Sequence, residues 1–431
     1  MKMKYLANLI LALTFFTSQL LSQQKLTLTD AFQKAVKNNE ELQTENLKVE
    51  NAELTSTNAF NNRLPSVKLS GRYSRVSEVD PFKIQLNPQM TPIEIVSPIQ
   101  NQYAMKATIT QPLFTGFKLE STNEAMNNLY ESTKKDLESK RTDVILKVAQ
   151  AYFNSIAAEK VLLVLNKNYE QLSKRVQDAE QMKNQGLLTE NDVLKIKVKL
   201  NEVEVSKIQA ENNLKITQMN LNLLIGDDIE TVYQLEIPEN KQVSNEKETR
   251  PELASLNYKL EAQKSSVSAA YGDWYPSLML QANYDYARPN SRIFPQKDEW
   301  KPTWDVNLVL SFDLWNWGTS SNNIQIAKNQ LQSMELGKSQ MEKIFTTEEK
   351  IAVYAVDKSS RSVKVLEKQV EQSLLNLKIS ENQYQAGLLS TTDLLDAQIQ
   401  SLQSDIQLIQ MQLDLKMNEL KLQKSRGVLK Y

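Results

Sequence analysis

Four short segments of the chain alternate apolar and polar residues with the period of a β-strand. They cover about residues 64–76, 102–114, 276–287 and 302–313. Each segment has the length of a tilted membrane strand, about 10 residues, and aromatic residues stand near its ends, where membrane strands carry them. On the alternation alone, half-buried strands of a soluble sheet are an equally good interpretation.

Long stretches between these segments carry apolar residues at spacings of three, four and seven. Examples are Val193, Ile196, Leu200 and Val203, then Ile399, Leu402, Ile406 and Ile409. This repeat indicates long helices that pack as coiled coils. The helices are expected at about residues 29–62, 118–184, 188–225, 251–274, 319–385 and 390–425. A soluble coiled-coil fibre would explain the helices equally well, but it would not explain the strands.

Nothing else in the chain is expected to cover the apolar faces of the strands. The loops at 77–101 and 288–302 are rich in Pro and poor in helix signals, and the other strand ends run into the long helices. Lipid is therefore the expected partner of these faces. About eight strands are needed to close a barrel, and an open edge in lipid leaves backbone groups unsatisfied. The barrel is expected to be shared between chains, as a dimer, trimer or tetramer.

The chain contains one long internal repeat. Residues 186–194 return at 387–395 and Leu113-Phe114 returns as Leu314-Trp315, roughly 200 residues later in both cases. Residues 63–73 match 274–284 at a spacing about ten residues larger, so one half carries a longer loop. We expect a first repeat at 23–226, a linker at 227–249, a second repeat at 250–427 and a tail at 428–431.

The first 22 residues have the pattern of a secretory signal peptide. Lys2 and Lys4 precede an apolar core at 6–16, and small residues follow at 18–22, so the mature chain is expected to leave the cytoplasm. No later segment shows the roughly 20 apolar residues of a membrane-spanning helix. With no Cys after the signal, no N-terminal lipid anchor is expected.

Composition excludes several classes of function. The chain has no His and no Cys, which removes thiol and imidazole chemistry, disulfides and the common zinc sites. We expect no enzymatic activity, no cofactor and no metal site. Charge is balanced, with 51 basic and 52 acidic residues, and no basic face points to nucleic acid.

A set of short motifs resembles one known family. The motifs are Leu26-Thr27-Leu28-Thr29-Asp30-Ala31, Asn39-Glu40-Glu41-Leu42, Arg250-Pro251-Glu252-Leu253, Gln111-Pro112-Leu113-Phe114-Thr115-Gly116 and Tyr384-Gln385-Ala386-Gly387. With them the mature chain resembles TolC-type outer-membrane efflux proteins over essentially its whole length. The resemblance implies a mainly α fold with a transmembrane β-barrel. In it, three chains share a twelve-stranded barrel, with four strands each, continued by a coiled-coil tunnel of twelve helices across the periplasm and a mixed belt at the waist.

The same resemblance implies a function. The trimer would be a channel between periplasm and exterior that docks a periplasmic adaptor and an inner-membrane pump, proton-driven or ATP-driven, in a tripartite efflux or type I secretion system. The helix tips expected to contact the adaptor are Gly186, Leu187 and Leu188, and Gly387, Leu388 and Leu389. The residues expected at the periplasmic gate are Asp192, Tyr384, Asp393 and Asp396. Leu389 stands where the family commonly has Arg, so the ionic latch of the gate is expected to be incomplete.

Each gate residue also has a purely structural interpretation. The three acids lie in the first turns of helices, where free N–H groups and the helix dipole favour carboxylates. Tyr384 falls on the same heptad series as Val363 and Leu377, so packing explains it about as well as gating. If Asp393 and Asp396 do meet near a threefold axis, their carboxylates would favour cations.

Two other classes of function fit parts of the sequence. A helical surface fibre, an adhesin or another structural envelope protein would share the helices and the signal peptide, but it should lack paired membrane strands and would conduct no ions. A soluble periplasmic adaptor would need compact β-domains, for which the strands are too few. The presence of two alternating segments in each repeat favours the channel.

Overall fold

The computed structural model describes residues 24–96, 99–238, 246–294 and 296–429. The expected signal peptide at 1–22 lies outside these residues, as do parts of the expected linker and tail. The helices are α2 (Leu28–Asn38), α3 (Glu40–Asn61), α4 (Lys118–Asn184), α5 (Glu190–Ile225), α6 (Pro251–Tyr271), α7 (Thr319–Gln385) and α8 (Thr391–Ser425), with the short 3-10 helix η1 (Gly272–Trp274). The strands are β1 (Gln24–Leu26), β2 (Ser66–Arg75), β3 (Phe82–Ile84), β4 (Ile93–Val96), β5 (Asn101–Phe114), β6 (Tyr233–Leu235), β7 (Ser277–Arg288) and β8 (Lys301–Ser311).

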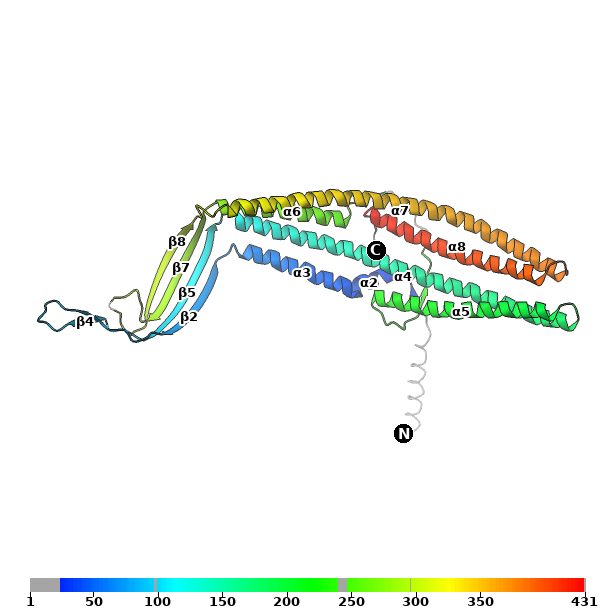
Figure 1. The fold of residues 1–431 in the computed structure, drawn as a ribbon, viewed down its shortest axis with the longest axis horizontal. Helices are drawn as coiled ribbons and strands as arrows, with labels where there is room; N and C mark the ends of the chain where they lie inside the picture. Colours follow the sequence, from blue (N-terminus) through cyan, green and yellow to red (C-terminus); the bar gives the residue numbers. More distant parts are fainter. Residues whose placement is uncertain (1–23, 97–98, 239–245, 295, 430–431) are drawn as a thin grey trace, which may run out of the picture. The chain divides into compact units, whose positions relative to one another are not determined.

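The chain forms two compact units, and both expected repeats contribute to each. The helical unit contains residues up to 47, 135–253 and from 340 onward, and the strand unit contains 48–134 and 254–339. The long helices α4 and α7 pass from the strand unit into the helical unit, so each repeat supplies two long strands and one helical hairpin (Figure 1).

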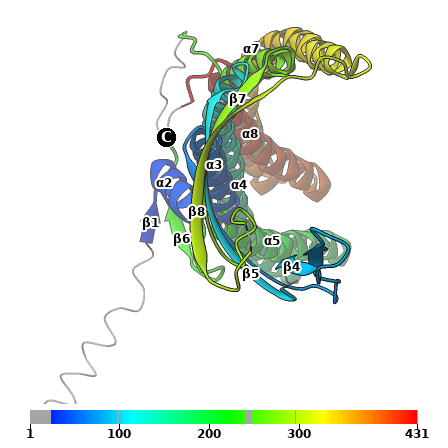
Figure 2. The same ribbon diagram turned by 90° about the vertical axis from the view of Figure 1, so that its left-hand side faces the viewer.

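The strand unit is built on one antiparallel sheet of four strands in the order β2-β5-β7-β8 (Figure 1). Figure 2 shows β5, β7 and β8 of this sheet from another side. This confirms the four strands expected from the alternation. The register places Leu69 opposite Ala107, Ala107 opposite Tyr284, and Tyr284 opposite Trp304. Directly opposed residues share a face of a sheet, so the apolar positions of all four strands gather on one face and the polar positions on the other.

The polar face of the sheet carries its own network of hydrogen bonds. The hydroxyl of Thr108 donates to the Asn283 side chain at 3.0 Å, and the Asn283 amide donates to the Asp305 carboxylate at 2.8 Å. Arg292, from the loop between β7 and β8, forms an ion pair with Asp285 at 3.2 Å and also contacts Asp305. The polar residues therefore pair with one another, while the opposite face is apolar over most of its length, with polar side chains only near the strand ends.

Strand β5 meets helix α4 at a tight corner. Gly116, between β5 and α4, has φ +64°, and a Cβ on it would lie 2.5 Å from the carbonyl oxygen of Gly272. Only a glycine allows this approach, since a side chain would clash with backbone. The ion pair between Lys118 and Asp273 at 2.8 Å closes the same corner. Within the loop 77–101, where the sequence suggested no regular structure, β3 and β4 form a short antiparallel hairpin.

The core of the helical unit surrounds the middle of α4. Val144, Ile145, Val148 and Tyr152 are almost fully buried there against residues of α2, α5, β1 and β6. The Tyr152 hydroxyl lies 2.8 Å from the Leu26 carbonyl oxygen and 2.6 Å from that of Glu236, and it accepts a hydrogen bond from the Glu236 N–H. Burial raises the pKa of Tyr152 to about 12, so this group stays neutral and joins the ends of the two short strands.

Two expectations about the helices need correction. The single helix expected at 29–62 is interrupted at Asn39, whose backbone is extended (φ −66°, ψ 124°). The Asn39 side-chain oxygen accepts hydrogen bonds from the N–H groups of Glu41 and Leu42, so Asn39 caps α3 and starts a second helix. In addition, α4 contains an 18-residue window apolar enough to cross a membrane by length and composition, although none was expected. The buried residues of α4 named above explain an apolar stretch by packing.

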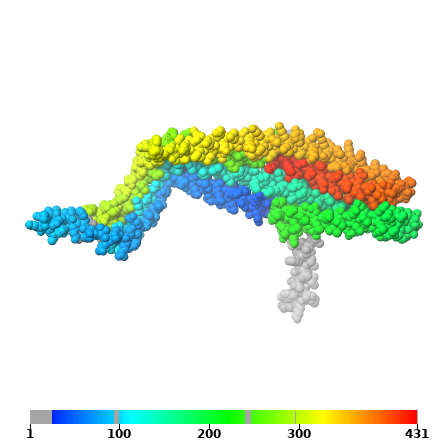
Figure 3. Space-filling model, viewed as in Figure 1, coloured from blue at the N-terminus to red at the C-terminus, as the bar shows by residue number. Residues whose placement is uncertain are grey.

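The helical unit holds two antiparallel helical hairpins, α4 with α5 and α7 with α8 (Figures 1 and 3). Leu165, Leu172 and Ala179 of α4 are buried at seven-residue spacing against Val193, Ile196 and Val203 of α5. Small polar residues line the second hairpin, where Ser359 of α7 is hydrogen-bonded to Asn418 of α8 at 2.8 Å. Both hairpins end in a glycine with positive φ, 75° at Gly186 and 70° at Gly387.

Candidate functional site

The tip of the first hairpin is held by a capping box. The Thr189 hydroxyl accepts a hydrogen bond from the Asp192 N–H at 3.2 Å, and the Asp192 carboxylate accepts from the Thr189 hydroxyl at 2.6 Å and from its N–H at 3.3 Å. These bonds satisfy donors at the start of α5 that the helix leaves free. Gly186 and Leu187 are exposed at the turn, and Leu188 is half-buried against the α4–α5 core.

The second tip repeats this arrangement with small differences. Ser390 caps α8, since its hydroxyl accepts from the Asp393 N–H at 3.2 Å and donates to the Asp393 carboxylate at 2.6 Å. Gly387 and Leu388 are exposed, Leu388 to 80 %, and Leu389 is half-buried. Asp192 and Asp393 thus have the helix-capping role that their position in the first turn predicts, whatever further role they have.

The two tips lie next to each other within the helical unit. The Lys195 ammonium of α5 donates to the Thr392 hydroxyl at the start of α8, at 3.3 Å. Hydrogen bonds from the Thr189 hydroxyl and the Thr189 N–H lower the pKa of Asp192, and the charge of Lys195 and a hydrogen bond from the Thr391 hydroxyl contribute in the same direction. Asp192 therefore stays charged at neutral pH and faces the second hairpin.

Asp396 and Tyr384 do not join this contact. Asp396 is exposed on α8, and among the described residues it has no hydrogen-bond or ion-pair partner. The Tyr384 hydroxyl is buried, but in the described part of the chain it has no hydrogen-bond partner either. Within one chain, then, the structure does not bring Tyr384 to Asp192 as a latch.

An ion pair that the sequence did not reveal connects the two hairpins. Arg175 of α4 donates to the Glu381 carboxylate of α7 at 2.6 Å, one helical turn before Tyr384. The Arg175 side chain is only 16 % exposed, whereas that of Glu381 is 38 % exposed. Partial burial reduces screening by water and salt, so this pair is a stronger link than a fully exposed one.

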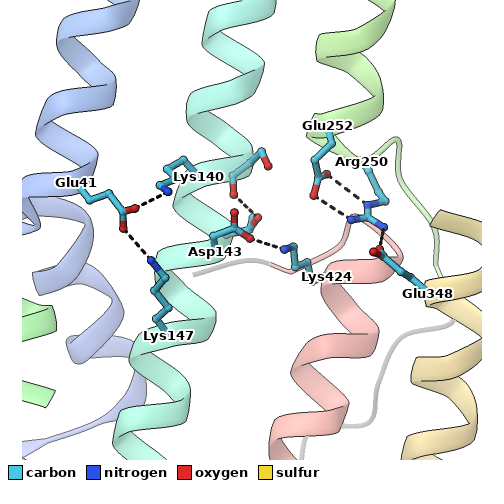
Figure 4. Close-up of polar contacts among 10 residues, drawn as sticks. Glu41, Lys140, Asp143, Lys147, Arg250, Glu252, Glu348 and Lys424 are labelled. Carbon is cyan, nitrogen blue, oxygen red and sulfur yellow. Dashed lines mark hydrogen bonds and ion pairs between the residues drawn. The ribbon is translucent and has the colours of Figure 1, made fainter. Parts of the chain in front are cut away.

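A band of ion pairs crosses the helical unit near the ends of α3, α6 and α8 (Figure 4). Its residues are Glu41, Lys140, Asp143, Lys147, Arg250, Glu252, Glu348 and Lys424. In the first repeat, Glu41 of α3 contacts Lys140 at 2.5 Å and Lys147 at 3.0 Å on α4, and hydrogen bonds from these two lysines lower the pKa of Glu41. Lys424 of α8 pairs with Asp143 of α4.

In the second repeat, Arg250 joins two acids of the band, at one end of it (Figure 4). It is buried, and its guanidinium forms ion pairs with Glu252 at 3.0 Å and with Glu348 of α7 at 2.8 Å. The guanidinium also lies 3.9 Å from the centre of the Phe345 ring, a cation–π contact. Ion pairs of the band therefore connect α3 to α4 in the first repeat and the start of α6 to α7 in the second.

Comparison with known proteins identifies the family of this fold. A family model described as outer membrane efflux protein matches residues 31–227 and 243–428. The chain belongs to the outer membrane efflux protein family. The two matched segments overlap the two expected repeats, although the second begins at residue 243, within the expected linker, and the expected TolC-type resemblance is confirmed.

Solved structures of outer-membrane channels share the fold of this outer membrane efflux protein. The Campylobacter jejuni CmeC channel is 18 % identical, with a TM-score of 0.79 over 93 % of this chain and 86 % of that one. The Vibrio cholerae outer membrane protein VceC is 17 % identical, with a TM-score of 0.77 over 93 % and 96 %. The open state of the Neisseria gonorrhoeae MtrE channel is 18 % identical, with a TM-score of 0.74 over 94 % and 89 %. A search of curated protein sequences found no match.

The family assigns the general activity. This outer membrane efflux protein is an outer-membrane efflux channel of the TolC type that extends into the periplasm, and the family consists of transport proteins rather than enzymes.

Proposed function

We propose that three copies of this chain form one channel, with β2 of each sheet paired to β8 of the next. The sheet itself carries this proposal, because its apolar face is exposed and its two edge strands have no neighbour in the described chain. Val67 and Leu69 of β2 and Trp304 and Leu310 of β8 are between 68 % and 78 % exposed. Four strands cannot close, and an open edge in lipid leaves backbone groups unsatisfied, so identical copies must complete the barrel.

A second exposed apolar surface supports self-association in the helical unit. On α5, the exposed apolar residues recur at helical spacing and lie away from the α4–α5 core. They are Val198, Val205, Ile208, Ile216, Met219 and Leu223. A contiguous apolar stripe of this kind is typical of a helix packed against another chain. In the proposed trimer it would contact a neighbouring copy and seal the tunnel.

The tunnel would deliver substrates from an inner-membrane pump through a periplasmic adaptor. The exposed leucines Leu187 and Leu388, at the two tips, offer apolar side chains for the adaptor, and the half-buried Leu188 and Leu389 position the turns. Export by the positively charged and apolar segment at residues 1–22 is part of the proposal. The pump would be proton-driven or ATP-driven, and it would select the exported compound.

The assembly is tested by cysteine cross-linking, for which the Cys-free chain is well suited. Ser70→Cys in β2 and Asn307→Cys in β8 place thiols on the polar faces of the two edge strands, and neighbouring positions vary the register. Oxidation should give a ladder of dimers and closed trimers, and the purified protein should conduct ions in planar bilayers. A monomer that forms no pore would refute the proposal and would favour the fibre alternative.

We also propose that Asp393 and Asp396 line the periplasmic entrance and favour cations. Both carboxylates lie on the exposed side of α8, one turn apart, opposite the buried residues Leu394 and Gln398. Three copies would bring six carboxylates to one constriction, where they attract cations. Cation selectivity and block by multivalent cations should fall in the Asp393→Asn, Asp396→Asn double variant and persist in the control Asp357→Asn. Unchanged selectivity and block in the double variant would rule out this ring.

A further inference from the structure

A cavity of about 230 Å³ lies inside the helical unit between α4, α5 and α8. Most of its lining is apolar, with Leu165 and Leu172 from α4, Val203 from α5, and Leu395 and Leu402 from α8. All these residues belong to the α4–α5 core or pack against it. The cavity therefore lies within the core that joins α4, α5 and α8.

One polar side chain in this lining is buried without a partner. Gln398 is only 3 % exposed, and within the described residues neither its side-chain oxygen nor its side-chain nitrogen makes a hydrogen bond. By contrast, Ser404, a buried residue further along α8, donates to the Gln400 carbonyl and accepts from the Gln369 amide. Burying an amide whose oxygen and nitrogen both lose water and gain no partner costs free energy. A bound ligand that hydrogen-bonds to both atoms of Gln398 would recover this cost.

The charged residues at this cavity are already neutralised. Lys199 and Glu202, which both line it, form an ion pair at 2.5 Å on α5. A charged ligand would find no free counterion there and would have to lose its hydration, which is unfavourable in an apolar site. The lining therefore favours a neutral ligand.

We propose that this cavity binds a small neutral molecule that joins a flat apolar ring to an amide-type edge. A donor and an acceptor side by side, as in a carboxamide or a lactam, can pair with the oxygen and the nitrogen of Gln398 at once. Apolar cavities of about 150 Å³ hold benzene, so this cavity is large enough for one ring with an amide group. The site bridges both hairpins, and it depends on neither the trimer nor the gate proposed above.

The test compares two probes of the same shape. Benzamide offers both a donor and an acceptor, whereas acetophenone has a methyl group in place of the amide nitrogen and keeps only the acceptor. Binding is measured by ligand-detected NMR titration on the full chain. We expect the wild type to bind benzamide at least about tenfold more tightly than acetophenone, because acetophenone leaves the Gln398 oxygen unpaired.

Two variants complete the design. Gln398→Leu should abolish the preference for benzamide, and the matched control Gln403→Leu, an exposed position of the same helix that also lines the cavity, should keep it. Equal affinities for both probes in the wild type, or a preference that survives Gln398→Leu, would overturn the proposal. Binding of neither probe would leave an ordered water as the partner of Gln398 and would also overturn it. The wild-type comparison decides even if Gln398→Leu does not fold.

Discussion

Breaking the ion pair between Arg175 and Glu381 should separate the two hairpins, and the two partners should not cost the same. Glu381→Gln leaves the guanidinium of Arg175 largely buried without a carboxylate, which costs about 2 kcal/mol. Arg175→Gln leaves Glu381, which is more exposed and can be hydrated, at a cost of about 1 kcal/mol. Because about 1.4 kcal/mol corresponds to a factor of ten, the separated population should rise roughly thirtyfold and fivefold.

The separation can be measured as a distance between the tips. Spin labels at Leu187→Cys and Leu388→Cys report only the introduced sites, because the chain has no other cysteine, and both positions are exposed. Pulsed EPR then gives the fraction of molecules with tips apart. Planar-bilayer recordings of the same variants give the resting conductance, which should rise in the same order if the tips form the gate.

The control for this experiment is an exposed pair on the same helix. Arg361 pairs with Asp357 one turn away on α7, and its side chain is 79 % exposed, so Arg361→Gln should change the separated fraction by less than about twofold. A double variant, Arg175→Gln with Glu381→Gln, should be less separated than the sum of the single effects predicts. Equal single effects and no coupling would show that the pair does not hold the hairpins together.

Three further predictions concern stability. Gly226→Ala should lower the melting temperature by several degrees, because φ is +73° there and the new Cβ would lie 2.6 Å from the Cβ of Asn38. Gly186→Ala, with open space around it, should cost only the left-handed backbone strain of about 1 kcal/mol. Thermal unfolding of both variants tests this difference, and equal shifts would contradict it. Arg250→Gln should destabilise by about 3 kcal/mol, because it leaves Glu252 and Glu348 facing each other, and a melting temperature like that of the wild type would show that the carboxylates find other partners. The lowered pKa of Glu41 stabilises the fold above the unfolded pKa of about 4.3, by less than about 1 kcal/mol because the group is partly exposed, and this stabilisation is lost as pH falls through the folded pKa. The stabilities of the wild type and Glu41→Gln should therefore differ at pH 7 and converge in acid. A difference that does not change with pH would exclude the linkage.

The strands and the long helices could be predicted because each leaves a periodic trace in the sequence. Leu69 and Trp304 fall on the alternating apolar positions of their strands, and the register of the sheet then follows from placing all apolar residues on one face. Asp192 and Asp393 follow a Gly turn and a hydroxyl residue, so their capping role could be predicted locally as well. Such features depend on residues close together in the chain.

Features that depend on distant residues had no such trace. Asn39 caps the helix that follows it, but its side-chain amide also donates to the carbonyl oxygen of the distant Leu224 at 3.1 Å, and this contact favours the interruption over a continuous helix. In the sequence, Arg175 and Glu381 look like ordinary charged residues of their heptads, and they meet only because the fold brings the two hairpins together. Without the packing, neither residue differs from the other charges of these helices.

The ion-pair band occupies corresponding positions in the two repeats, but the residues at those positions differ in charge. Glu41 and Lys147 of the first repeat correspond to Glu252 and Glu348 of the second, so the long helix carries a base in one repeat and an acid in the other. Two facing acids would repel each other, and Arg250, at the position of the capping residue Asn39, enters between them and pairs with both. In both repeats, ion pairs connect a short helix to a long helix, but the basic residues lie on the long helix in the first repeat and the basic residue is Arg250 in the second. Corresponding positions of the two repeats therefore carry different charges, so the repeat alone does not give the partners of each ion pair, and only the structure shows them.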